Sequence, residues 1–395
     1  MRRPLRKRYG RVLCAVAVVA LGTAAPSVAR VGAAAVANCG DTSGLPPTTL
    51  YHQTPWAQRR LGFERVWPIT QGAGVTVAVV DTGVDGIQPF LKGAVRPGYD
   101  VVNHGGVADT DCNGHGTFVA GLIAARPIVG YGFAGVAPAA TILPIREANS
   151  TGTSSAEVLA KCIRAAVERH VQVINVSITA PLPAPDLVSA VNYALRHNVL
   201  VVAAAGNDFA SGNGPQYPAA SPGVLAVGAV DASGQRATFS ESGSYVSVVA
   251  PGTGLIGPGA GGVGLVSESG TSFATAYVSG VAALVRSYYP KLSVPQVIRR
   301  LEATADQPPG KLPTAGLGWG EVNPYAAITA MLPAPEGRPD PASTRVAGPP
   351  PPPARSGSGR AVMGVAVGGS ALAVLILLCG QVVVRGRRRG WRPGV

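Results

Sequence analysis

The chain has 395 residues and a formal net charge of +13, from 33 basic and 20 acidic side chains. Seven of the net positive charges lie in residues 1–37 and five in residues 385–395, which leaves +1 for residues 38–384. The basic character belongs to the two ends, so the charge gives no reason to expect nucleic-acid binding. The length suits one large α/β domain with terminal extensions.

Residues 1–37 have the layout of a signal peptide. Six basic residues precede a 14-residue apolar stretch at 12–25, and small residues fit cleavage after Ala29 or Ala37. An uncleaved anchor is the alternative, but 14 residues are too few to span a bilayer. The polar, Pro-containing residues 38–60 are too short for a domain of their own and are expected to form an N-terminal extension along the main body.

Residues 61–332 alternate between two kinds of segment. Continuous apolar runs, typical of strands buried on both faces, occur at 75–80, 142–145, 171–176, 199–204, 224–230 and 245–250. Helix-like patterns occur between and after them at 116–125, 155–170, 186–197, 272–289, 294–304 and 323–332. This alternation predicts an α/β fold with a mostly parallel central sheet covered by helices on both faces.

The C-terminal part reads as a linker, a membrane span and a tail. Residues 333–360 contain nine prolines and are expected to be a Pro-rich linker without a packed core. Residues 361–384 carry no charge and as a helix would reach roughly 36 Å, enough for a transmembrane helix, although a buried core helix is the alternative. The Arg-rich residues 385–395 mark the cytoplasmic end, which places residues 61–332 outside the cell at the plasma membrane.

Three cysteines remain outside the signal peptide and the predicted span. Cys39 and Cys112 lie in loop-like sequence, whereas Cys162 lies in a helical pattern. An oxidising exterior permits disulfides, and Cys39 with Cys112 is the favoured pair, but the sequence leaves the pairing open. Cys162 is expected to be a small buried apolar residue rather than a reactive thiol.

A carboxylate follows the first apolar run, in the segment V-A-V-V-D-T-G that contains Asp81. In open α/β sheets, sites form at the carboxyl ends of the strands. A turn aspartate is one alternative, because Asp is common in turns. Half of an aspartic-protease dyad is another, but the chain has no second D-T-G or D-S-G.

Two further polar residues occupy the starts of predicted helices. His115 lies in D-C-N-G-H-G-T-F-V-A-G, where flanking glycines permit a tight turn before an apolar helix. Ser272 lies in S-G-T-S-F-A, which would place its hydroxyl and its own N–H at a helix N-terminus. Negative charge that develops during a reaction is stabilised at such a position. A helix-capping serine is the alternative for Ser272. No H-E-x-x-H or paired His and Cys spacing points to a metal, and no cofactor is expected.

Asn207 ends the segment V-V-A-A-A-G-N, directly after another apolar run. Its amide is suited to donate a hydrogen bond to an oxyanion together with the N–H of Ser272. Asp81, His115, Asn207 and Ser272 thus each follow a strand or begin a helix, and this shared placement points to one site.

The sequence resembles the subtilisin family, whose D-T-G, H-G-T-x-V-A-G, G-N and G-T-S-x-A motifs match here in the same order. Within that family it is most similar to the mycosins, membrane-anchored proteases attached to type VII secretion systems. The resemblance implies a subtilisin-like three-layer fold and a serine endopeptidase with Asp81, His115 and Ser272 as its triad, acting through an acyl-enzyme. Asn207 and the Ser272 N–H would form the oxyanion hole.

The resemblance also implies partners. Ser177, Ile178 and the segment that holds Asn149 and Gly152 would line the groove for a polypeptide substrate, and membrane components of a type VII secretion system would be neighbours. It allows a different role too, in which the folded ectodomain stabilises the secretion complex and proteolysis is dispensable. One departure from the family is Ala276, which stands where a proline is usual.

Overall fold

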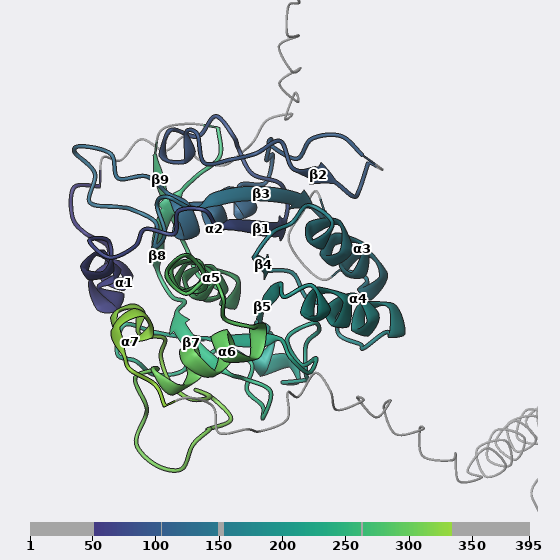
Figure 1. The fold of residues 1–395 in the computed structure, drawn as a ribbon, viewed down its shortest axis with the longest axis vertical. Coiled ribbons are helices and arrows are strands. Elements are labelled where there is room, and N and C mark those ends of the chain that lie inside the picture. Colours follow the sequence, from purple (N-terminus) through teal and green to yellow (C-terminus); the bar gives the residue numbers. More distant parts are fainter. Residues whose placement is uncertain (1–50, 104, 149–153, 262–263, 334–395) are drawn as a thin grey trace, which may run out of the picture. The chain divides into compact units, whose positions relative to one another are not determined.

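The computed structural model describes residues 51–103, 105–148, 154–261 and 264–333. The chain divides into residues 1–332 and 333–395, and everything below concerns the described part of the first unit (Figure 1). The predicted signal peptide, the Pro-rich linker, the membrane span and the Arg-rich tail lie outside the described residues. Within the described ranges, no helix is both long and apolar enough to cross a bilayer.

A seven-stranded sheet forms the centre of the fold, in the order β2-β3-β1-β4-β5-β6-β7, and all six pairings are parallel (Figure 1). Its strands are β1 (Thr76–Asp81), β2 (Tyr99–Asp100), β3 (Thr141–Arg146), β4 (Val173–Val176), β5 (Leu200–Ala204), β6 (Leu225–Val230) and β7 (Val248–Pro251). An antiparallel hairpin follows, with β8 (Leu255–Pro258) and β9 (Leu265–Glu268). The predicted parallel sheet is confirmed.

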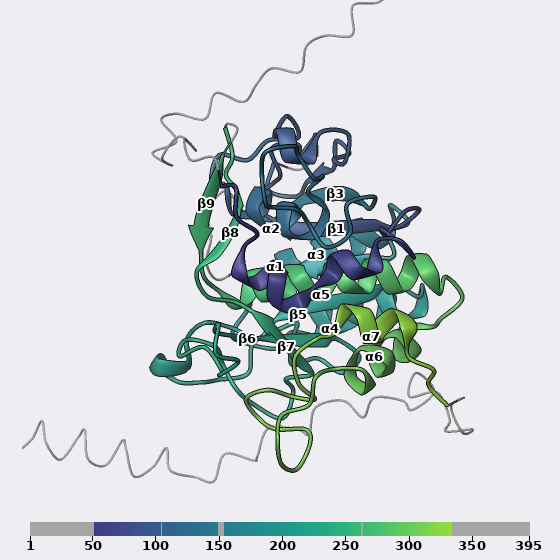
Figure 2. The same cartoon turned by 90° about the vertical axis from the view of Figure 1, so that its left-hand side faces the viewer.

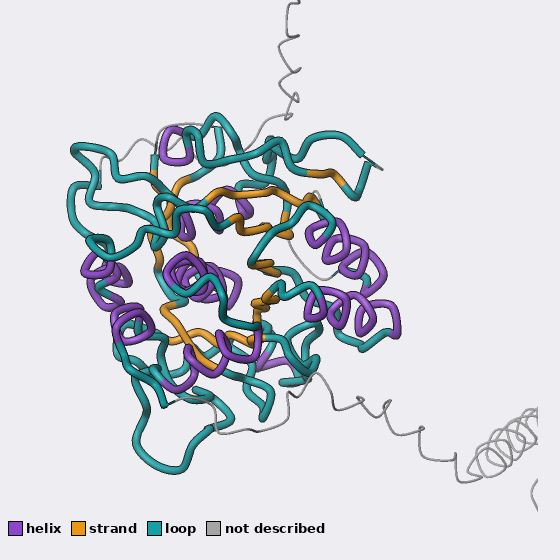
Figure 3. Tube along the Cα trace, in the orientation of Figure 1, coloured by secondary structure: helices purple, strands orange, loops and turns teal. Residues whose placement is uncertain are grey.

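Helices cover both faces of this sheet, as the tube view shows (Figure 3). They are α1 (Trp56–Leu61), α2 (His115–Ala124), α3 (Ala156–Val167), α4 (Pro185–Arg196), α5 (Thr271–Tyr288), α6 (Val294–Ala303) and α7 (Pro324–Thr329), with 3-10 turns η1 (Phe63–Val66), η2 (Pro89–Leu91) and η3 (Phe209–Ser211). Helices α3 and α4 pack on one face, and α2 and α5 on the other.

The two large hydrophobic cores of the described residues lie on opposite faces of the sheet, because successive side chains of a strand point to opposite faces. Val77 and Val79 of β1 belong to the core shared with α2 and α5, whereas Ala78 and Val80 belong to the core shared with α3 and α4. All four side chains are fully buried. This explains why the strand reads as a continuous apolar run rather than as an alternating one.

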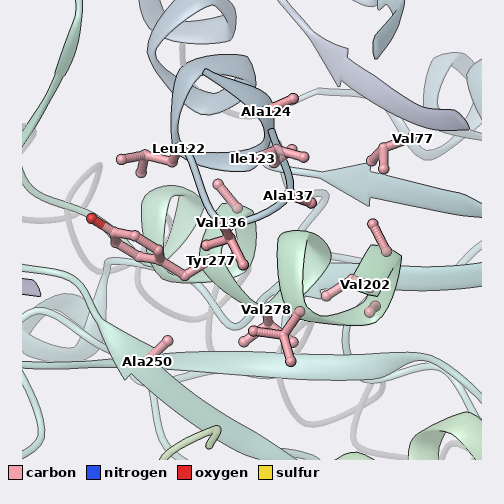
Figure 4. Close-up of a cluster of buried hydrophobic side chains, with 14 of the residues drawn as sticks. Val77, Leu122, Ile123, Ala124, Val136, Ala137, Val202, Ala250, Tyr277 and Val278 are labelled. Atoms are coloured by element: carbon pink, nitrogen blue, oxygen red, sulfur yellow. The ribbon is translucent and has the colours of Figure 1, made fainter. Parts of the chain in front are cut away.

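Helix α5 runs through the larger core. Residues 271–286 of this helix are all buried, and it contacts α2 and the strands β4 to β7. Figure 4 shows Tyr277 and Val278 of α5 beside Val136 and Leu122. Gly280 brings α5 against Val136, because an added Cβ would lie 2.6 Å from the Val136 Cβ. Ala276 is buried within this helix, which continues unbroken past it.

Part of the expected N-terminal extension packs on the body. Helix α1 buries Ala57 and Leu61, and the Trp56 indole N–H donates to the Thr253 carbonyl at 3.1 Å. Figure 2 shows α1 crossing in front of α5. The short strand β2 and the β8–β9 hairpin were not among the expected elements.

Candidate active site

Polar residues gather where three neighbouring strands end. Asp81 is the last residue of β1, Ser177 directly follows β4, and Asn207 follows β5 after two residues. Strands β1, β4 and β5 are adjacent and parallel. Their carboxyl ends therefore meet at the same edge of the sheet, which is where sites form in such folds.

The Asp81 carboxylate is fully buried at this edge. Its Oδ1 accepts hydrogen bonds from the Thr82 N–H at 2.8 Å and from the His115 Nδ1 at 2.7 Å. A buried carboxylate is stable only when it is paired or hydrogen-bonded, and here the imidazole is one of its partners. This contact fixes the orientation of the His115 ring, with Nδ1 as the donor.

His115 is the first residue of α2, and a second carboxylate holds this helix start. Asp111 accepts hydrogen bonds from the backbone N–H groups of Asn113, Gly114 and Thr117, at 2.9–3.0 Å. The bond from Thr117 satisfies an N–H of the first helical turn, which the helix itself leaves without a partner, and the other two fix the loop that leads into the helix. Asp111 was not predicted as a site residue, although the D-C-N-G-H segment contains it.

The surroundings of His115 favour its protonated form. Burial lowers the pKa of His115, whereas the charge of Asp81 and the hydrogen bond to it raise this pKa. The carboxylates of Asp111 and Glu268 add to the increase, so the pKa lies above the ordinary value of 6.5. An imidazole whose Nδ1 is held by a carboxylate in this way is suited to accept and return a proton at Nε2.

Ser272 is the second residue of α5 and is 5 % exposed. Its hydroxyl donates to the Ser177 carbonyl at 2.9 Å. The following residue, Phe273, places its ring against the His115 imidazole with centroids 5.0 Å apart. Rotation about the Cα–Cβ bond moves a serine hydroxyl between staggered positions. In addition, hydrogen bonds between catalytic groups often shorten only when a substrate binds.

The first residue of α5, Thr271, fixes the orientation of the Asn207 amide. Its Oδ1 accepts hydrogen bonds from both the N–H and the hydroxyl of Thr271, each at 2.9 Å. This pair of donors assigns the oxygen of the amide, so Nδ2 is left as its donor. Asn207 is exposed and lines the same cavity as Ser272.

These residues share a cavity of about 400 Å³. His115, Ser272 and Asn207 line it together with Ser177 and Ile178. The structure therefore brings together an imidazole, a hydroxyl and an amide donor, with a buried carboxylate behind the imidazole. This combination can activate a hydroxyl as a nucleophile and stabilise an oxyanion.

The model of the subtilase family matches residues 72–320, more than half of the chain. This chain belongs to the subtilase family. It is a subtilisin-like serine peptidase with the subtilisin fold.

Two curated relatives of this subtilase cover most of its length. Mycosin-1 of Mycobacterium tuberculosis is 35% identical over 347 residues, which cover 73% of this chain and 76% of the mycosin. Thermitase of Thermoactinomyces vulgaris is 35% identical over 285 residues, which cover 72% of this chain and 99% of thermitase. The subtilase is thus similar both to a mycosin and to thermitase.

Solved structures agree with this relationship. The MycP3 protease from the type VII (ESX-3) secretion system aligns with a TM-score of 0.65 and 36% identity, covering 72% of this chain and 91% of that one. A chain in the periplasmic assembly of the ESX-5 inner membrane complex aligns with a TM-score of 0.65 and 32% identity, covering 78% and 92%. The subtilase is therefore related to the mycosins of type VII secretion systems.

The other predicted site residues have different outcomes. Ser177 and Ile178 line the cavity, whereas Asn149 and Gly152 lie outside the described residues. Cys39 also lies outside them, so its pairing with Cys112 stays a prediction. Cys162 is buried in α3 and free, and burial raises the pKa of its thiol well above the ordinary value. The ranges with described side chains hold no group of three His, Cys, Asp or Glu residues suited to a metal.

Proposed function

We propose that this subtilase is a membrane-anchored, extracytoplasmic serine endopeptidase with Asp81, His115 and Ser272 as its triad, associated with a type VII secretion system. The observation that carries the catalytic part is the 2.7 Å hydrogen bond from His115 to the buried Asp81, made at the wall of the cavity that also holds Ser272. Such a relay is defined by geometry and role rather than by position in the chain.

In the proposed reaction, the Ser272 hydroxyl attacks a peptide carbonyl while His115 accepts its proton. Asp81 keeps the proton on Nδ1, so Nε2 is the free base, and it stabilises the imidazolium that forms. Nδ2 of Asn207 and the N–H of Ser272 donate to the oxyanion. His115 then protonates the leaving amine, and a water molecule releases the acyl group by the same steps in reverse order.

The proposed location rests on the two ends of the chain. The signal-like residues 1–37 would direct secretion, residues 361–384 would span the plasma membrane, and the Arg-rich tail would remain in the cytoplasm. The relative found in the periplasmic assembly of the ESX-5 complex supports an extracytoplasmic peptidase domain that contacts secretion components. A polypeptide is the proposed substrate.

Ser272→Ala tests the catalytic proposal. We expect the purified full-length protein to react with a fluorophosphonate and to cleave unstructured polypeptides, and Ser272→Ala to lose both activities. Ser287→Ala is the matched control, because this serine lies near the far end of α5 and its hydroxyl bonds the Ala73 carbonyl. Labelling of Ser272→Ala at the wild-type rate would contradict the proposal.

A structural role in the complex is the second candidate, supported by the same ESX-5 assembly. Here the folded domain would stabilise the secretion machinery, and proteolysis would be dispensable. Complementation of a deletion strain separates the two roles. Full rescue of secretion by Ser272→Ala favours the structural role, whereas loss of secretion with normal protein levels favours proteolysis.

A further inference from the structure

A carboxylate lies hidden behind one wall of the active-site cavity. Gly206 forms part of this wall, and a Cβ placed on it would lie 3.0 Å from Oε1 of Glu241. The N–H of Glu241 donates to the Gly206 carbonyl at 3.0 Å, which fixes the two residues against each other. Glu241 is 0 % exposed. Only glycine fits at position 206, because an added Cβ would lie 2.6 Å from Cγ of Gln216 and 2.9 Å from Cδ of Glu241.

Glu241 has only neutral partners among the described residues. Its Oε1 accepts from the Gln216 amide at 3.2 Å and its Oε2 from the Tyr245 hydroxyl at 3.4 Å, both long hydrogen bonds. Burial raises the pKa of Glu241, the hydrogen bonds of Gln216 and Tyr245 lower it, and the charge of Asp208 raises it. The net direction is upward, as expected for a carboxylate without a compensating cation.

Arg236, five residues before Glu241 in the chain, has other partners. The guanidinium of Arg236 donates to the carbonyls of Ala237 and Ser240 and stacks on the Phe209 ring, 3.8 Å from its centroid. No salt bridge reaches Glu241 within the described ranges. The buried carboxylate therefore has no cation among its described partners, and a cationic side chain would have to displace the Gln216 amide to reach it.

The rim of the cavity has the same sign of charge. Asp208 and Glu268 line it and are exposed, and its described lining includes no lysine or arginine. His115 is the one basic side chain in that described lining. Carboxylates at the mouth of a cleft attract cations and raise their local concentration.

The cavity wall at Gly206 lies next to the bond that would be cleaved. The carbonyl oxygen of the scissile bond would point at the Asn207 amide, and Gly206 directly precedes Asn207. In the substrate, the residue that contributes the scissile carbonyl bears its side chain on the Cα bonded to that carbonyl carbon. That side chain is therefore the part of the substrate that would extend along Ala204 and Gly206, in front of Glu241.

We propose that this subtilase selects substrates with lysine or arginine as the residue that supplies the scissile carbonyl, and that Glu241 determines this specificity. The inference rests on the proposed proteolytic function. The long aliphatic stem of a lysine or arginine would lie on the cavity wall, and its cationic end would replace the Gln216 amide as the partner of Glu241. Pairing of opposite charges in a water-poor pocket discriminates against neutral and acidic side chains.

The test compares peptides that differ only in this residue, cleaved by the full-length protein in detergent. We expect kcat/KM for lysine and arginine to exceed that for norleucine and glutamine at least about tenfold, and glutamate to be the poorest. Glu241→Gln keeps the size of the side chain and should abolish the lysine-to-norleucine ratio. Glu302→Gln, a half-buried carboxyl on α6, is the control and should preserve the ratio.

A second measurement does not depend on the variants. Phosphonate esters with a lysine-like or a norleucine-like side chain should phosphonylate wild-type Ser272 at rates with the same tenfold bias. Equal rates, or faster reaction with norleucine, would overturn the specificity proposal while leaving the serine-peptidase proposal intact. Absence of reaction with fluorophosphonate and with every peptide would instead overturn the proposed function itself.

Discussion

The charges around the His115 imidazole affect its pKa and therefore the pH range in which it can accept a proton. Three carboxylates raise its pKa, and they differ in burial: Asp81 and Asp111 are buried, whereas Glu268 is exposed. Buried neighbours act through a medium of low polarity and are screened little by salt, whereas exposed ones are screened strongly. Each carboxylate therefore contributes differently to the pH dependence of the reaction.

We expect the rate of fluorophosphonate labelling to rise with pH, with a midpoint above 6.5, because only the neutral imidazole accepts the proton of Ser272. Glu268→Gln should lower this midpoint by roughly a few tenths of a pH unit, since an exposed charge contributes about 0.2–1 kcal/mol. The shift should shrink in high salt. Glu157→Gln, on the exposed surface of α3, is the control. A midpoint unchanged by Glu268→Gln would contradict this account.

Glu302 gives a prediction about stability. Burial raises the pKa of this carboxyl from 4.5 to about 7, and a hydrogen bond with Ser247 lowers it less. A raised carboxyl pKa means that the folded state holds the proton more tightly, so this group lowers stability as the pH rises from about 4.5 to about 7. We expect Glu302→Gln to melt at a higher temperature than wild type at pH 8 and at the same temperature near pH 4. A lower melting temperature of the variant at pH 8 would be the opposite result.

The start of α2 is held tightly against the loop after β1. An added Cβ at Gly116 would collide with the Gly83 carbonyl and would lie 3.1 Å from Oδ1 of Asp81. Gly121, later in the same helix, instead faces the Pro258 ring of β8. Overpacking either position costs about 1–3 kcal/mol, but only the first displaces the pair of Asp81 and His115.

We therefore expect both Gly116→Ala and Gly121→Ala to lower the melting temperature. Gly116→Ala should in addition reduce the labelling rate at least about tenfold, because a displacement of about 1 Å at a catalytic group has a large effect on rate. Circular dichroism melts and fluorophosphonate kinetics on both variants check this. Equal losses of rate in the two variants would show that general destabilisation, rather than the position of His115, is responsible.

The sequence was most informative where local pattern and tertiary role coincide. Asp81, His115, Asn207 and Ser272 could be predicted because each lies at a strand end or a helix start, and parallel strands bring such ends together. Strand β2 has two residues and depends on pairing with β3, and the hairpin β8–β9 surrounds a Gly-rich segment, so neither shows a periodic pattern. Glu241 was missed because its importance comes from contact with Gly206, 35 positions earlier in the chain.

For the whole molecule, the proposed location depends on the two termini. We expect the full-length protein to sediment with membranes and to resist alkaline carbonate extraction, because a span of about 20 apolar residues inserts stably. A chain ending at residue 360 should appear mainly in the medium and still react with fluorophosphonate. Equal membrane retention of the two forms would show that residues 361–384 are not the anchor.

The burial of α5 links the chemistry of this subtilase to its folding. The helix that carries the proposed nucleophile in its first turn passes through the larger core, and residues 271–286 are buried along its length. A chain that lost this core would also lose the position of Ser272 in the cavity that His115 lines. An activity-based fluorescent stain would therefore label only native molecules, which makes it a direct measure of how much of the enzyme in living cells is correctly folded.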